Sequence, residues 1–258
     1  MILKDKKIEY KHASDEITSL VKKRILELRN KPIEGAFDVA HLQEIHRVIF
    51  QDVLGVPNAA LVVREDFTPG KFRSPVPEGL SWKKERSLKS TDKIHPIYYS
   101  SMNTENIKKL ETILKSTSLE QMSKLPEDKF KYEMAVLYAK LDQIHPFNDG
   151  NSRTLREFTS HLAKNSGYII EWSKLDSEQG HELLYIARDK SVNTITSESL
   201  TSLKEKVVLQ LSIAHLKDYP DLTGLLPLII QKQEQCKTLD LPPPEKGRKK
   251  SGSERGGR

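Results

Sequence analysis

Apolar residues recur at helical spacing along most of the chain, which predicts a largely helical protein. In residues 15–29 they share one face behind Ser14, a residue that suits an N-cap, and in residues 39–53 the same pattern follows Asp38. The longest apolar side falls in residues 126–143, so we expect this helix at the centre of the core. Further helical segments are predicted over residues 106–114, 154–164, 177–190, 197–216 and 225–230.

Two segments break the helical pattern. An apolar run at residues 61–63, followed by a Pro-Gly turn signal, predicts a small hairpin within residues 60–77. Pro75 and Pro77 exclude a central strand, so this hairpin is expected at an exposed edge. Residues 78–96 are charged and irregular, which predicts a loop.

Composition narrows the class of protein. The 258 residues are 36% hydrophobic, with no apolar run near the roughly eighteen residues of a membrane span and no long apolar core of a signal peptide. The single Cys236 excludes an internal disulfide and a cysteine-rich zinc site, and suits a reducing compartment. Six basic and two acidic residues in 241–258 supply +4 of the net charge of +6. The body is therefore close to neutral, and a nucleic-acid partner is not expected.

One short stretch after the predicted central helix combines unlike chemistries. Gly150, Asn151 and Ser152 are small residues just before a predicted helix, where exposed amides and the helix dipole bind anions. Arg153 and Arg156 lie three apart, so both project from one side of the first turn and can grip phosphate oxygens. The pattern predicts a phosphate-binding turn.

The same stretch supplies an acid, a base and an anchor. Asp149 beside an anion site suits a Mg²⁺ ion that bridges it to phosphates, and His145 can reach over the turn as a general base. Phe147 is expected to be buried and to fix the loop. Each residue alone is more often structural, but the combination favours a functional site. His41 and His46 lie five apart, off a common helical face, and are predicted to be packing or solvent histidines.

The stretch closely resembles the signature of Fic-domain proteins, His-x-Phe-x-(Asp/Glu)-Gly-Asn-Gly-Arg-x-x-Arg, with every defined position matched except Ser152. Flanking residues resemble Fic proteins of conjugation and type IV secretion. The resemblance implies an all-α Fic fold with a small β-hairpin flap, and a protein adenylyltransferase that moves AMP from ATP to a hydroxyl side chain of a target protein. Together with the helical pattern and the Pro-, Gly-, Ser- and Lys/Arg-rich composition of the C-terminus, it divides the chain into an N-terminal helical extension (1–35), the Fic core (36–195), C-terminal helices (196–240) and a disordered basic tail (241–258).

The resemblance also implies a role for each matched residue. His145 would deprotonate the target hydroxyl, Phe147 would anchor the loop, and Asp149 would hold Mg²⁺. The phosphates of ATP would lie against Gly150, Asn151, Ser152, Arg153 and Arg156. A second matched segment resembles the flap motif Gly-x-(Tyr/Phe)-Arg, which docks the target by strand addition. Its residues are Gly70, Lys71, Phe72 and Arg73.

Several alternatives remain open. Ser152 adds a Cβ where the family has Gly, and the related Doc branch, with Lys there, phosphorylates its target, so a Doc-like kinase or other nucleotide transfer is an alternative. A catalytically silent binding module is another. An inhibitory motif, (Ser/Thr)-x-x-x-Glu-(Gly/Asn), matches residues 101–106 and partly matches 201–206, and both are expected to be chance. Inhibition would then come from a small antitoxin-type partner or be absent. The expected location is the bacterial cytoplasm, with export by a type IV secretion system as an option.

Overall fold

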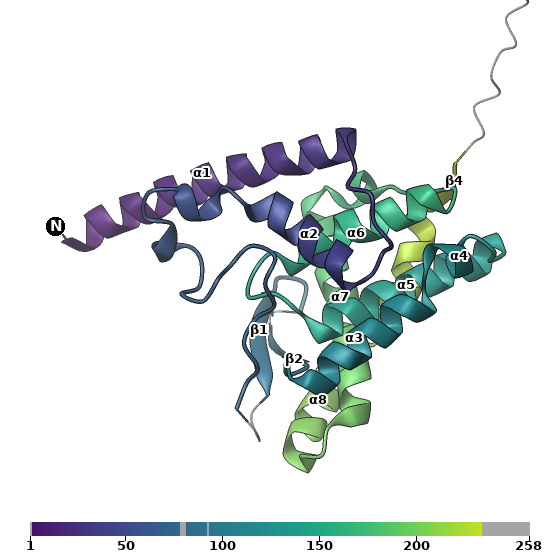
Figure 1. Cartoon of the computed structure of the whole chain (residues 1–258). Helices are drawn as coiled ribbons and strands as arrows, with labels where there is room; N and C mark the ends of the chain where they lie inside the picture. Colours follow the sequence, from purple (N-terminus) through teal and green to yellow (C-terminus); the bar gives the residue numbers. More distant parts are fainter. Residues whose placement is uncertain (1, 78–80, 92, 234–258) are drawn as a thin grey trace, which may run out of the picture.

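The computed structural model describes residues 2–77, 81–91 and 93–233, so the predicted tail at 241–258 lies outside the described residues. Its first element, α1 (Ile2–Asn30), runs along the top of Figure 1 and packs against α2 (Val39–Phe50). The sequence predicted only the second half of α1, because the apolar face is confined to it. Ser14 lies inside the helix and does not cap it.

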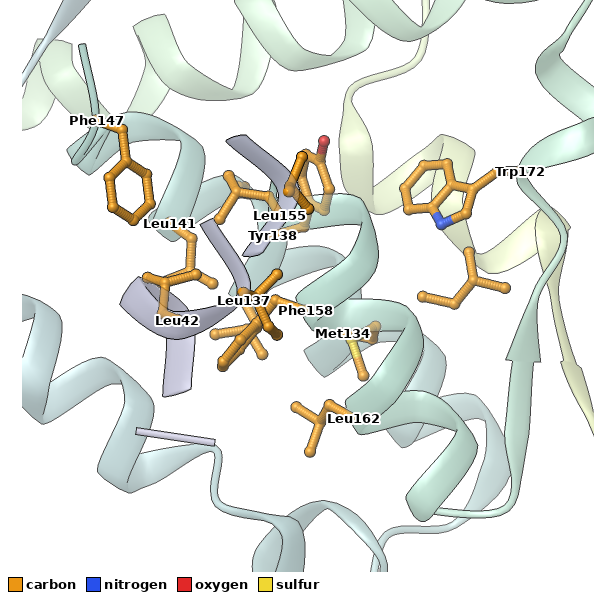
Figure 2. Packing of buried hydrophobic residues seen from close by; sticks show 14 of the residues in the cluster. Leu42, Met134, Leu137, Tyr138, Leu141, Phe147, Leu155, Phe158, Leu162 and Trp172 are labelled. Atoms are coloured by element: carbon orange, nitrogen blue, oxygen red, sulfur yellow. The ribbon is translucent and has the colours of Figure 1, made fainter. Parts of the chain in front are cut away.

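The core forms where α2, α5 (Glu127–Ile144), α6 (Asn151–Asn165) and α7 (Glu178–Ser199) meet. The central position predicted for α5 is confirmed, since one side of it is fully buried, at Phe130, Met134, Leu137, Tyr138 and Leu141. Figure 2 shows side chains from α2, α5 and α6 interleaved in this cluster, with Phe147 at one end and Trp172 at the other. Burial of this cluster drives folding and fixes the two helices, α5 and α6, that flank the predicted phosphate-binding turn.

Shorter elements complete the molecule. Asn103 caps α3 by accepting from the backbone N–H of Asn106, so this helix begins two residues earlier than predicted. A small sheet of β3 (Tyr168–Ile170) and β4 (Ile230–Lys232), which the sequence did not predict, joins the end of α6 to the C-terminal region. The other elements are η1 (Val53–Gly55), η2 (Ala59–Leu61), α3 (Thr104–Ser116), α4 (Leu119–Met122), η3 (Trp172–Leu175), α8 (Leu203–His215), α9 (Leu222–Leu225) and η4 (Leu226–Ile229). No helix in the described ranges is long and apolar enough to cross a membrane.

The hairpin exists, but the predicted location was wrong. It is formed by β1 (Trp82–Leu88) and β2 (Lys93–Tyr99), mostly inside the segment predicted as a loop, and it extends downward in Figure 1 next to α8. The apolar run at residues 61–63 instead lies in and after a 3-10 turn, with Val62 and Val63 packed against the core. Exposed and half-buried positions alternate along β1, but both kinds are mostly charged, so its strand period was hidden by its polarity.

Helix α7 covers one edge of this hairpin. The Asn193 side chain donates to the carbonyl of Pro96 at 2.9 Å and accepts from the backbone N–H of Tyr98 at 3.3 Å. Thr196 donates to the Tyr98 carbonyl at 2.8 Å. These bonds satisfy the outer edge of β2, whereas within the described ranges β1 pairs only with β2. The edge open to a further strand is therefore that of β1.

Candidate active site

The loop between α5 and α6 is closed by its own side chains. His145 ends α5 in the left-handed conformation, with φ of 50°. Asn151 accepts from the backbone N–H of Phe147 at 2.9 Å and donates to its carbonyl at 2.6 Å. Phe147 is fully buried and stacks on the ring of His46, with centroids 3.9 Å apart. The loop is thus held between a helix end and a buried aromatic pair.

His46 also fixes the turn by hydrogen bonds. Its Nδ1 accepts from the backbone N–H of Gly70 at 2.8 Å, so its Nε2 carries the proton and lies 3.1 Å from the carbonyl of Asp149. Burial lowers the pKa of His46 to about 4, so the ring is neutral. The packing role predicted for this histidine is confirmed, and its two bonds join the segment at Gly70 to the phosphate-binding turn.

The segment proposed as a docking edge has another role in the structure. Arg73 is buried, at 2% exposure, and its Nε donates to the carbonyl of His145 at 2.7 Å. Its backbone N–H donates to the carbonyl of Pro146 at 2.9 Å. Gly70–Arg73 therefore lies outside the hairpin and supports the loop, because a buried guanidinium beside a helix C-terminus finds its acceptors in the exposed carbonyls.

The start of α6 faces a cavity of about 530 Å³. No side chain caps this helix at Gly150, so its first-turn N–H groups remain available to an anion. Arg156 leans over the Trp172 ring at 5.3 Å, and its Nε has no hydrogen-bond partner among the described residues. The cavity is lined by Lys84, Arg86, Tyr99, His145, Asp149, Gly150, Asn151, Ser152, Arg153, Arg156, His181, Tyr185 and Arg188. The lining holds five lysines and arginines and one carboxylate; Arg86 and Arg188 are paired with Asp189 and Asp142 behind it, and the remaining excess of positive charge suits an anion.

His145 lines the same cavity at the C-terminal end of α5. Its Nε2 lies 2.9 Å from the Nζ of Lys84, and its Nδ1 lies 3.7 Å from the Oδ1 of Asp142. Asp142 in turn forms a bidentate pair with Arg188, at 2.7 and 2.8 Å. Burial is the main reason that the pKa of His145 falls to about 4, so the imidazole is neutral near pH 7 and able to accept a proton.

The residues of the turn could be predicted from the sequence, but those that reach the cavity from other segments could not. Lys84 and Arg86 lie on β1, whose strand character was not recognised, and Arg188 lies on α7. The one available signal was Asp142, an acid three residues before His145, which helical geometry brings near the imidazole.

Comparison with known proteins identifies the domain. Residues 36–163 match the Fic/DOC family. The chain contains a Fic domain. It is 26% identical over 159 residues to the protein adenylyltransferase VbhT of Bartonella schoenbuchensis, covering 60% of this chain and 27% of that protein. A protein adenylyltransferase of Bartonella henselae is 26% identical over 158 residues, covering 61% of this chain and 27% of that protein. The chain thus spans about a quarter of the length of these relatives.

Solved Fic structures share the fold. The N-terminal Fic domain of a VirB-translocated Bep effector protein of Bartonella quintana, with bound ADP, superposes with a TM-score of 0.52 at 21% identity, over 87% of both chains. The VirB-translocated effector BepC of Bartonella tribocorum, with bound AMPPNP, gives 0.55 at 16% identity, over 87% of this chain and 89% of that one. The all-α class with a small hairpin is therefore confirmed.

Ser152, the position that departs from the Fic signature, fits the backbone without strain. It is the second residue of α6, and its φ is not positive. The positive φ that does require glycine belongs to Gly150, at 75°. The added Cβ of Ser152 thus leaves the helical geometry of the anion site unchanged.

Neither candidate inhibitory glutamate reaches Arg156 in this Fic domain. Glu105 lies exposed in the first turn of α3. Glu205 lies in the first turn of α8 and accepts from the Ser81 hydroxyl at 3.3 Å. Within the described part of the chain Arg156 forms no ion pair, so the second arginine of the motif is open toward the cavity.

Proposed function

We propose that this Fic domain transfers AMP from ATP to a hydroxyl side chain of a target protein. The observation that carries the proposal is a neutral His145 and the open N-terminus of α6 on one cavity, with Arg153 and Arg156 beside them. This arrangement combines a base with a preorganised site for several phosphates, and positioning plus charge neutralisation accounts for most of phosphoryl-type catalysis. The names of the Bartonella relatives support the same reaction.

Each group that the proposed AMP transfer requires is present at this site. The target hydroxyl attacks the α-phosphorus of ATP, its proton passes to Nε2 of His145, and the bond to the β-phosphate oxygen breaks as pyrophosphate leaves. The backbone N–H groups at the start of α6 bind the phosphate oxygens, while Arg153 and Arg156 neutralise the charge that develops on the leaving group.

A divalent cation fits the acid of this site. The Asp149 side chain is 48% exposed, and its Oδ1 accepts from the Gly150 N–H at 2.6 Å, which holds the carboxylate at the cavity rim. The described residues contain no cluster of three acidic, histidine or cysteine ligands, so a cation here would also need phosphate and water oxygens, as Mg²⁺ prefers. When bound, Mg²⁺ would neutralise phosphate charge. Asp149 is the residue that would hold it.

Target docking belongs to the hairpin in this proposal. Among the described residues the outer edge of β1 is unpaired, and side chains on one of its faces, Lys84 and Arg86, line the cavity. A target segment added along β1 would therefore bring a hydroxyl toward His145. Main-chain bonds would give affinity, and the alternating side chains would give specificity.

Labelled nucleotide tests the proposed reaction. The protein is incubated with host-cell lysate and ATP that carries label at the α- or the γ-phosphate, with His145→Ala as the matched inactive variant. Label from the α-position in a target protein, absent with His145→Ala, is the expected result. Label from the γ-position alone would instead establish the Doc-like kinase reaction. Absence of label from both positions would favour a binding module without catalysis.

Inhibition and export are further parts of the proposal. Because Arg156 has no acidic partner among the described residues, an inhibitor would be a separate small protein that supplies a carboxylate to it. Such a partner would lower the affinity for ATP, which titration of the complex would measure. The type IV relatives suggest export, which a translocation reporter fused to the full chain would test.

A further inference from the structure

The side chain of Lys84 is hydrogen-bonded to Nε2 of His145, the nitrogen that would accept a proton in the proposed reaction. It lies on the cavity side of β1, opposite Ile97 in the hairpin register, while its neighbours Lys83 and Glu85 are exposed on the other face. Its Nζ is 2.9 Å from Nε2 of His145. The lone pair that would accept the proton of a target hydroxyl is therefore already hydrogen-bonded to the hairpin.

The chemistry of an ammonium group fixes the form of the imidazole. Burial lowers the pKa of Lys84 to about 8, so it is still protonated near pH 7. An ammonium donates and cannot accept, so Nε2 of His145 must be the acceptor and Nδ1 must carry the ring proton. Nδ1 lies 3.7 Å from the Oδ1 of Asp142, which favours the same tautomer. Lys84 and Asp142 thus hold His145 in the form a general base requires.

Side chains from four elements surround the imidazole, and three of them are charged. Lys84 of β1 and Arg188 of α7 disfavour a protonated ring, Asp142 of α5 favours it, and the Tyr99 ring of β2 packs 4.0 Å away. Arg188 is engaged in its bidentate pair with Asp142, whereas the ammonium of Lys84 contacts the ring nitrogen directly. In the described part of the chain Lys84 makes no ion pair, so its polar contact is the imidazole itself.

Lys84 is also close to charges at the cavity rim. Arg64 disfavours its protonated form and Asp149 favours it, both through space. Among the described residues, no carboxylate holds its ammonium in place. The group can therefore leave Nε2 of His145 and turn toward anionic oxygens in the cavity that it lines.

We infer that Lys84 is a positioning residue that caps Nε2 of His145 until a target hydroxyl displaces it. The inference rests on the proposed AMP transfer. With the cap in place, the base is held in the correct tautomer but is closed to water, so attack of water on the α-phosphorus, which would release AMP and pyrophosphate, is suppressed. The target hydroxyl takes the place of the ammonium as the donor to Nε2, and the displaced ammonium then neutralises phosphate oxygens.

The test compares Lys84→Met with Lys83→Met, an exposed lysine on the other face of the same strand. Nuclear magnetic resonance of His145 reports its tautomer and its titration. We expect Lys84→Met to raise the pKa of His145 by about one unit, because a facing cation has been removed. At saturating ATP without target, AMP release should rise roughly tenfold, because the charge-assisted hydrogen bond that closes Nε2 to water is lost and such a bond corresponds to about a tenfold change. Lys83→Met should change neither quantity, and Lys84→Arg, which keeps the charge, should retain the low pKa.

The outcomes separate this inference from the proposed function. If the protein transfers no AMP, AMP release is absent in all variants, but the titration of His145 in Lys84→Met still decides whether the cap exists. An unchanged titration and tautomer in a folded Lys84→Met variant would overturn the inference. So would a fall in AMP release at saturating ATP, since the ammonium would then act on phosphate and would not restrain the base.

Discussion

The guanidinium of Arg73 and the backbone carbonyl of His145 form a 2.7 Å hydrogen bond across 72 residues of sequence. The same side chain donates to the carbonyls of Ile144, at 3.3 Å, and Ser100. Burial lowers the pKa of Arg73 to about 10, so it remains charged near pH 7, and it lies over the Trp82 ring at 4.4 Å. One buried cation thus satisfies the C-terminal carbonyls of α5 and fixes the backbone of the proposed base.

Removal of this cation should loosen the catalytic loop. We expect Arg73→Met to reduce the free energy of unfolding by about 3 kcal/mol, because buried carbonyls lose their donors. The rate of AMP transfer should fall as well, since His145 loses a fixed backbone. Urea denaturation and an AMP-transfer assay measure the two effects, and Lys71→Met, an exposed lysine two residues earlier, is the matched control. Equal stability of the two variants would contradict the supporting role of Arg73.

The ion pair beneath the imidazole gives a second prediction. Asp142 and Arg188 are 1% and 4% exposed. Burial opposes the ionisation of Asp142, but Arg188 outweighs it and holds the pKa of Asp142 below its ordinary range. Asp142→Asn leaves a buried arginine without its counter-charge, so we expect a loss of about 3–5 kcal/mol. The double variant Asp142→Asn with Arg188→Met should lose less than the sum of the single variants.

This pair also has a defined pH dependence. A carboxyl whose pKa is lower in the folded state stabilises the fold above its unfolded pKa, and this stabilisation is lost as pH falls through the folded pKa. The contribution of Asp142 should therefore be complete at neutral pH and decline only below about pH 4. Denaturation curves at several pH values would show this. For the double variant Asp142→Asn with Arg188→Met, a loss of unfolding free energy equal to the sum of the two single losses would show that the two residues act independently.

Gly150 should tolerate no side chain. Its φ is 75°, and a Cβ built on it would lie 2.2 Å from the Cζ of Phe50. Gly150→Ala therefore combines backbone strain with a clash against a buried ring, and we expect a loss of about 2 kcal/mol or more together with loss of nucleotide binding. Gly55→Ala is the matched control, because a Cβ added there would meet nothing within 4 Å. Calorimetry and ATP titration would measure both variants, and a stable Gly150→Ala that binds ATP would refute this account.

The sequence predicted those site residues that are close together along the chain. His145, the turn and the two arginines lie within twelve residues of one loop and one helix, so local spacing defines their geometry. Arg73, Lys84 and Arg188 reach the same place from distant segments, and only tertiary packing brings them together. Their sequence neighbourhoods carry no signal for that contact.

The hairpin shows how local patterns can mislead. The apolar run at residues 61–63 suggested a strand, but Val62 and Val63 instead pack against the core beside a 3-10 turn, and Leu61 is exposed. In β1 the strand period is carried by charged residues, with Lys84 and Arg86 facing the cavity and Lys83 and Glu85 exposed on the other face. A strand beside a polyanion site does not alternate apolar with polar residues, so the usual hydrophobic period is absent.

Restoration of the family glycine should have little effect. Because Ser152 has helical backbone geometry, Ser152→Gly removes only a hydroxymethyl group near the start of α6. We expect a loss of less than about 1 kcal/mol, from the greater freedom of glycine in the unfolded chain. AMP transfer should proceed at a similar rate, with label from the α-phosphate in both proteins. A change from α- to γ-label on substitution would show that Ser152 sets the orientation of the nucleotide.

A buried imidazole outside the cavity makes stability depend on pH. His161 on α6 is 5% exposed, and neither ring nitrogen has a hydrogen-bond partner among the described residues. Burial lowers the pKa of His161 to about 4. Between about pH 6.5 and about pH 4 the unfolded chain then binds a proton that the folded state does not, so stability falls as pH is lowered through this window.

His161→Leu isolates this contribution. An apolar side chain of similar size removes the unpartnered nitrogens, so we expect equal or greater stability at about pH 7.5 and a smaller loss of stability on acidification. The difference between the two proteins should grow by about 2 kcal/mol between about pH 7 and about pH 4.5. Urea denaturation at both pH values measures it, and His12→Leu, at an exposed position on α1, controls for the removal of an imidazole as such. Parallel pH dependence in the wild type and His161→Leu would mean that this ring is protonated in the folded state and is not the source of acid sensitivity.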